Sequence, residues 1–235
     1  MGDGKNATVI TLADIESAPI LVGDNIEFRD LSIIAAASVT AETAGLGSCV
    51  TTLSGLSLGI TQLDNLKFSN CYFRGGSSYD AGANEDKVYK YALDLSTDDN
   101  VGTSANTNVS IEGCDFHFTG AGIRFSRWKG VTISNSNFTT ETKDIAFTQM
   151  VEGLSFQGAT NTALEYGLGT DAEVAGEVSI SNCRFTGEMD GDGTLPYRGW
   201  IFIAPNYQGQ GFAVDNCSFV GDRVGDGATP IPLNG

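Results

Sequence analysis

An eight-residue pattern of apolar and polar positions recurs along the chain. Four alternating positions are followed by Asn, Asp or Gly, then usually by Cys, one polar residue and Phe. The copies are Ile26–Ile33, Leu66–Phe73, Val109–Phe116, Val131–Phe138, Val178–Phe185 and Phe212–Phe219, with Leu154–Gly158 as a truncated copy. A period of two places the apolar residues on one face of a strand. The pattern therefore predicts repeated strands that share one core.

The fifth position of each copy predicts a tight bend, which we name the repeat bend. Its occupants are Asp30, Asn70, Gly113, Asn135, Gly158, Asn182 and Asn216. These residue types adopt positive φ more readily than others. After such a bend, the sixth and eighth residues of the copy point inward again.

The spacing of the copies predicts the architecture. Copies that begin at residues 109, 131, 154 and 178 are 22, 23 and 24 residues apart, a period typical of solenoids. Each unit has only strand and turn signals, so it predicts one coil of a β-helix, with about seven or eight coils rising about 4.8 Å each. The longer intervals, of 40, 43 and 34 residues, hold either an extra coil or a long loop. A second strand column is predicted at Leu93–Leu95, Ile123–Phe125, Ile145–Phe147, Leu164–Tyr166 and Ile201–Ile203.

The Asn bends, the inward Cys and Phe positions and the period together resemble the right-handed parallel β-helix superfamily, the pectate-lyase-like fold. The resemblance implies an all-β, single-stranded, right-handed parallel β-helix solenoid over residues 25–221. Residues 1–24 then form an N-terminal cap, in which Thr8–Leu12 is a candidate strand, and residues 222–235 form a C-terminal tail. We also expect an irregular coil between residues 35 and 62, such as Leu53–Ile60. The superfamily includes polysaccharide lyases, glycoside hydrolases, phage tailspikes, virion decoration proteins and adhesins, so the fold alone does not select a function.

Composition and charge restrict the partners. The 235 residues are 41% hydrophobic and suffice for one domain, and the net charge of −16 argues against nucleic acid and anionic membrane as partners. The first residues contain no basic region followed by an apolar run, so we expect no secretory signal and no transmembrane span.

The five cysteines predict buried thiols. Cys71, Cys114, Cys183 and Cys217 share the sixth position of the repeat, whereas Cys49 lies outside it. Ser136 and the truncated copy are expected to separate Cys114 from Cys183. This pattern favours folding in a reducing cytosol over a disulfide framework, and without a Cys-x-x-Cys motif we expect no metal site and no cofactor.

Candidate catalytic chemistry is sparse. Glycoside hydrolysis needs two facing carboxylates. The outward columns predicted from the repeat are Glu27, Lys67, Ser110, Thr132, Ser155, Ser179, Ala213 and Arg29, Ser69, Glu112, Ser134, Gln157, Ser181, Asp215. Neither column places two carboxylates on neighbouring coils. Asp94 with Arg124 is expected to be a structural ion pair, Asp115 and His117 are weak candidates for an acid–base site, and Asp190–Gly193 matches only part of a calcium loop.

Aromatic residues outside the repeat are the candidate binding residues. Tyr79, Trp128, Tyr197 and Tyr207 are candidates for stacking on sugars or for anchoring an interface. The alternative for Trp128 is simple packing over a coil edge.

These observations favour a non-catalytic structural protein of a phage virion, such as a capsid decoration protein, head spike or short tailspike, folded in the host cytoplasm. The resemblance implies a homotrimer that contacts other virion proteins and binds host-surface polysaccharide. The alternatives are a polysaccharide lyase or glycoside hydrolase, and a non-catalytic glycan-binding adhesin.

Overall fold

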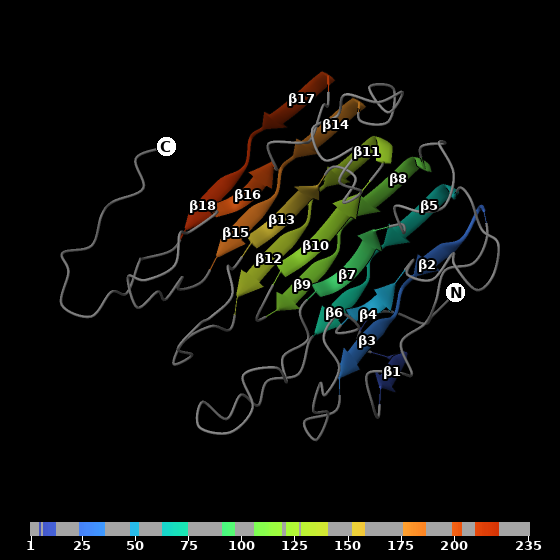
Figure 1. Cartoon of the computed structure of the whole chain (residues 1–235). Helices are drawn as coiled ribbons and strands as arrows, with labels where there is room; N and C mark the ends of the chain where they lie inside the picture. Colours follow the sequence, from blue (N-terminus) through green and yellow to red (C-terminus); the bar gives the residue numbers. More distant parts are fainter. Residues whose placement is uncertain are drawn as a thin grey trace, which may run out of the picture.

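All regular structure in the described chain is β-strand. The computed structural model describes residues 5, 7–12, 24–35, 48–51, 63–74, 91–96, 106–118, 121–126, 128–140, 152–157, 176–186, 199–203 and 210–220. These residues form eighteen strands in three sheets, which Figure 1 shows stacked in chain order from blue to red. The predicted all-β class is therefore confirmed. No described residue belongs to a helix that is long and apolar enough to cross a membrane.

The three sheets differ in length. The six-stranded sheet consists, in spatial order, of β2 (Glu27–Arg29), β5 (Asp64–Ser69), β8 (Asn106–Glu112), β11 (Trp128–Ser134), β14 (Gly176–Ser181) and β17 (Gln210–Asp215). The seven-stranded sheet consists of β1 (Val9–Leu12), β3 (Ser32–Ala35), β6 (Tyr72–Arg74), β9 (Asp115–Phe118), β12 (Asn137–Thr140), β15 (Arg184–Thr186) and β18 (Ser218–Val220). The five-stranded sheet consists of β4 (Ser48–Thr51), β7 (Tyr91–Ser96), β10 (Ala121–Ser126), β13 (Glu152–Gln157) and β16 (Gly199–Ile203).

From β2 onward the chain visits the three sheets in a fixed rotation. A strand of the six-stranded sheet is followed by one of the seven-stranded sheet and then by one of the five-stranded sheet. We call three such consecutive strands a rung. Every pairing between described strands is parallel. Neighbours within a sheet are therefore three elements apart in sequence, as with β5, β8 and β11.

The repeat bend joins the six-stranded sheet to the seven-stranded sheet. The six occupants that the structure describes all have positive φ, from 48° at Asn216 to 63° at Gly113, as predicted; Gly158 lies outside the described residues. Each bend also bonds to the next rung: the backbone N–H of Asn182 donates to the carbonyl of Asp215 at 3.1 Å. The Nδ2 of Asn216 donates to the Oδ1 of Asn182 at 2.6 Å, so side chains and backbone both tie adjacent bends together.

The apolar positions of the repeat fill the core in columns. The eighth position forms a stack of phenylalanine rings with centroids 4.7–5.3 Å apart, through Phe73, Phe116, Phe138, Phe185 and Phe219. Phe138, in the middle of the stack, is 0% exposed. Because the parallel register aligns identical positions of successive rungs, each ring meets a ring, in the offset stacking that aromatic pairs favour.

The cysteines form a second column, as predicted. Cys71, Cys114 and Cys183 are buried, Cys217 is half-buried, and all five cysteines are free thiols. Cys49 is buried in β4, and burial raises its pKa to about 12.

Ser136 occupies the same column without an unpaired hydroxyl. Its Oγ donates to the carbonyl of Ser134 at 2.8 Å and accepts from the backbone N–H of Cys114 at 3.1 Å. Two hydrogen bonds explain why a buried serine is tolerated there.

The assignment of Leu154–Gly158 to the main repeat is wrong. Leu154 and Phe156 lie in β13, in the five-stranded sheet, where they pair with β10 and β16. The truncated copy has the alternation of a strand but lacks the Cys and Phe positions that follow a repeat bend. Val131 consequently pairs directly with Val178, and Ser136 alone separates Cys114 from Cys183.

The long intervals hold connections and no additional coils. β2 pairs directly with β5, β5 with β8, and β14 with β17, which leaves no place for an extra coil between them. The described strands therefore form five complete rungs, the pair β17 and β18, and β1, fewer than the seven or eight coils expected. The regular spacing near 23 residues misled, because residues 131–178 form one rung of 47 residues with a strand near its middle.

The remaining expectations divide between confirmed strands and residues outside the description. Strands at Leu93–Leu95, Ile123–Phe125 and Ile201–Ile203 are confirmed in β7, β10 and β16, and Thr8–Leu12 contains β1, which extends the seven-stranded sheet beside β3. Sequence analysis missed β4. The predicted segments outside the described residues are Ile145–Phe147, Leu164–Tyr166, Leu53–Ile60 and the tail 222–235.

Candidate functional site

The predicted aromatic binding residues do not gather at a described site. Tyr79, Tyr197 and Tyr207 lie outside the described residues. Trp128, the first residue of β11, is 1% exposed, and its Nε1 donates to the carbonyl of Leu95 at 2.5 Å. A buried ring with its only donor satisfied has no free face for a sugar, so Trp128 follows the alternative of packing in the core.

Asp115 and His117 lie side by side on β9, but neither has a partner suited to acid–base catalysis. Asp115 Oδ2 forms an ion pair with Lys5 Nζ at 2.5 Å, and its Oδ1 accepts from Asn137 Nδ2 at 2.7 Å. The His117 ring lies 5.2 Å from the ring of Tyr72, centroid to centroid. The residues in register with Asp115 are Tyr72 and Asn137, so no second carboxylate faces it across the sheet.

The outward face of the six-stranded sheet follows the predicted columns with one change. The register aligns Glu27, Lys67, Ser110, Thr132, Ser179 and Ala213 in one column and Arg29, Ser69, Glu112, Ser134, Ser181 and Asp215 in the other. Ser155 and Gln157 were placed in these columns wrongly, since they belong to β13 in the five-stranded sheet. As predicted, neither column has carboxylates on neighbouring rungs.

Glu27 is the centre of an exposed charge cluster at one end of this face. Its Oε1 lies 2.6 Å from Arg29 Nη2 and 3.5 Å from Lys67 Nζ. The hydrogen bond from Arg29 and the two positive charges hold the pKa of Glu27 below its usual value. Glu27 is thus a paired carboxylate, unlike the protonated acid that glycoside hydrolysis requires.

A second column of positive-φ residues, which we name the upstream bend, was not predicted. It lies five residues before the repeat bend and consists of Asn25, Asn65, Asn108, Gly130, Glu177 and Gly211. The signal was present in the sequence, because Asn precedes the first apolar position in three copies. It was obscured because Asn within a strand pattern reads as an ordinary outward polar residue.

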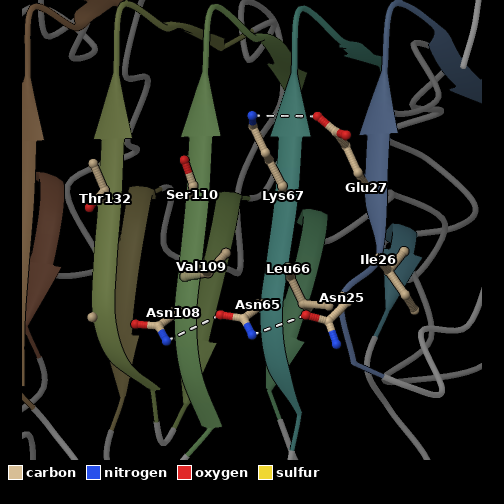
Figure 2. A pocket seen from close by; sticks show the side chains of 11 residues that line it. Asn25, Ile26, Glu27, Asn65, Leu66, Lys67, Asn108, Val109, Ser110 and Thr132 are labelled. Carbon is tan, nitrogen blue, oxygen red and sulfur yellow. Dashed lines mark hydrogen bonds and ion pairs between the residues drawn. The ribbon is translucent and has the colours of Figure 1, made fainter.

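The asparagines of the upstream bend form an amide ladder, which Figure 2 shows running across three strands. Asn65 Nδ2 donates to Asn25 Oδ1 at 3.1 Å, and Asn108 Nδ2 donates to Asn65 Oδ1 at 3.2 Å. The ladder stops at Gly130, which has no side chain. A Cβ added to Gly130 would lie 2.8 Å from Asn108 Oδ1, so the carboxamide borders the space over the glycine.

An open groove of about 400 Å³ follows this ladder. Its polar lining consists of the amides of Asn25, Asn65 and Asn108, the charged Glu27 and Lys67, and the hydroxyls of Ser110 and Thr132, and it ends at Gly130. Polar side chains therefore recur at each rung along the groove (Figure 2). Such a surface can hold an extended polar ligand by many weak hydrogen bonds.

Other predicted chemistry is located only in part. Asp94 and Arg124 are register partners on β7 and β10, and nothing further is described of their side chains. Asp190–Gly193 lies outside the described residues. Within the described part of the chain, no three His, Cys, Asp or Glu side chains are placed to hold a metal ion.

Comparison with protein families, curated proteins and solved structures finds no match to this chain. The functional argument therefore rests on the fold and on the groove.

Proposed function

We propose that the chain is a right-handed parallel β-helix that acts as a non-catalytic surface protein of a phage virion and binds host-surface polysaccharide in the groove of the six-stranded sheet. The β-helix is supported by the fixed rotation of the chain through three parallel sheets. Right-handed crossover between parallel strands is the nearly universal rule, which favours that hand.

The observation that carries the proposal is the composition of the outward face of the six-stranded sheet. Its groove presents amides and hydroxyls, and no two carboxylates face each other across neighbouring strands. Amides and hydroxyls both donate and accept hydrogen bonds, as sugar hydroxyls do. Rungs repeat at about 4.8 Å, which is comparable to the length of one sugar unit in an extended chain. A repeating surface therefore suits a repeating polymer.

The virion assignment rests on the resemblance of the repeat to phage β-helix proteins. The same resemblance supports a homotrimer. Small polar side chains at Ser110, Thr132 and Ser179 allow rigid faces to approach closely, and the end of the stack leaves Val214, Phe219 and Val220 exposed for contact.

The binding half is tested by affinity electrophoresis in gels that contain host-surface polysaccharide. Replacing both Asn65 and Asn108 by glycine removes two amides while keeping residues that tolerate positive φ. We expect retardation of the wild-type protein and at least a tenfold weaker effect for the double variant. Asn70→Gly is the matched control, since Asn70 also has positive φ and a bonded amide but lies outside the groove.

The assembly and catalytic halves are tested together. Native mass spectrometry should give a trimer, and incubation with the same polysaccharides should release no new reducing ends or unsaturated sugars. A stable monomer that depolymerises a polysaccharide, and that loses this activity in Asp115→Asn or His117→Ala, would replace the proposal with the enzyme alternative.

A further inference from the structure

Glu177 is the one described residue with positive φ that is neither Asn, Asp nor Gly. Its φ is 50°, and it occupies the fifth place of the upstream bend. A β-carbon with a long side chain is disfavoured in this conformation, which Asn and Gly adopt more easily. Residues held in such conformations concentrate at functional sites, so an observed outlier is a reason to look for a ligand.

The surroundings of Glu177 leave space for a ligand. The register places Glu177 between Gly130 and Gly211, the two upstream-bend positions without side chains. A Cβ added to Gly211 would lie 3.9 Å from Glu177 Cγ, so the side chain borders that glycine. On the far side of Gly130, the carboxamide of Asn108 ends the amide ladder. Glu177 is exposed and has no ion-pair partner among the described residues.

We infer that the gap over Gly130, bordered by Asn108 and followed by Glu177, is a subsite for a neutral sugar unit, and that Glu177 determines its specificity. This inference rests on the proposed function and names the class of glycan. An ionised carboxylate only accepts hydrogen bonds, and its two oxygens can accept from adjacent hydroxyls of one sugar. The same charge, in a protein with net charge −16, disfavours uronic acids.

The conformation of Glu177 gives the test a signature that a merely solvated glutamate would not have. Glu177→Asn relieves the backbone and should raise Tm by about 2–4 °C, while it removes the carboxylate that the sugar contacts. We therefore expect a variant that is more stable and binds at least tenfold more weakly. Glu177→Gln keeps the strain and the side-chain length, and should reduce the preference for neutral over acidic glycans.

The probes are dextran, mannan and galactomannan as neutral polysaccharides and polygalacturonate as the acidic one, compared by affinity electrophoresis at equal ionic strength. Glu112→Gln is the matched control, because Glu112 is an exposed carboxylate on the same face but outside the groove. We expect wild-type protein and Glu112→Gln to bind a neutral probe and not polygalacturonate.

The outcomes separate this inference from the proposed function. Should Glu177→Asn bind as the wild type does while the Asn65 and Asn108 double variant fails, the role of Glu177 is wrong and the groove stands. Binding to polygalacturonate alone overturns the neutral-sugar class. Binding of the wild type to no polysaccharide overturns both proposals.

Discussion

The phenylalanine stack offers the sharpest test of how the rungs stabilise one another. Phe138 is 0% exposed and lies between two rings, with centroids 4.8 Å from Phe116 and 4.7 Å from Phe185. Phe219, at the end of the same stack, is 43% exposed and contacts one ring, Phe185, at 4.9 Å. Alanine at each position therefore compares one side chain in two environments.

The expected costs follow from these contacts. Phe138→Ala removes a fully buried ring and leaves a cavity, which costs about 3–5 kcal/mol of unfolding free energy. Phe219→Ala loses a little over half of the transfer free energy of a phenylalanine, about 1–1.5 kcal/mol, and one ring pair worth about 0.5–1.5 kcal/mol. It leaves no enclosed cavity, so its cost should be about 2 kcal/mol and the difference between the two variants about 1–3 kcal/mol.

Urea unfolding followed by circular dichroism measures both variants against the wild type. The midpoint should shift further for Phe138→Ala, with m unchanged if the unfolded state is unaffected. Phe138→Leu keeps most of the volume and serves as the control should Phe138→Ala fail to fold. An equal or larger cost for Phe219→Ala would refute the reasoning, since it would mean that the last ring is buried in solution.

Three further predictions concern the bends and the cysteine column. Asn182→Ala places a β-carbon without a polar group at φ 52° and should cost about 1–2 kcal/mol, with Asn182→Gly costing less; equal melting temperatures for both variants and the wild type would contradict this. Ser136→Ala removes both hydrogen bonds of the buried hydroxyl and should cost about 1–3 kcal/mol in urea unfolding, whereas an unchanged midpoint would show that neither bond matters. Burial raises the pKa of Cys49 to about 12 and that of Cys183 to about 11, from an ordinary value of 9.0, so their contribution to stability is complete below pH 9 and is lost as pH rises toward 11–12. Cys49→Ala should therefore lose less stability than the wild type between pH 9 and 12, and identical pH profiles would refute the assignment.

The repeat could be predicted because each of its positions carries a separate physical signal. Alternation fixes which face of the strand is buried, and Asn182 or Asn216 marks where the backbone bends. The truncated copy at Leu154 failed because alternation alone identifies a face and not a sheet. In the other copies, the bend followed by Cys or Ser and by Phe supplies that missing information, as in Val178–Phe185.

The candidate site could not be predicted in the same way. Trp128 is large, apolar and able to donate one hydrogen bond, properties that suit a sugar-binding surface and a core equally well. Only the tertiary contact with the carbonyl of Leu95 decides between them. The groove depends on φ at Asn25, Asn65 and Asn108, and their side chains acquire a common direction only when the rungs are stacked in register.

The two bend columns show how the demands of folding and of binding can be distinguished. Every described occupant of the repeat bend is Asn, Asp or Gly, the residues that the conformation itself favours. The upstream bend has the same backbone requirement and lines the groove, yet it contains Glu177. A carboxylate at that position lowers the stability of the bend and adds an acceptor that glycine lacks. Because the backbone alone would favour Asn or Gly there, the departure is explained by a ligand that accepts neither substitute, which is why stability and binding should change in opposite directions in Glu177→Asn.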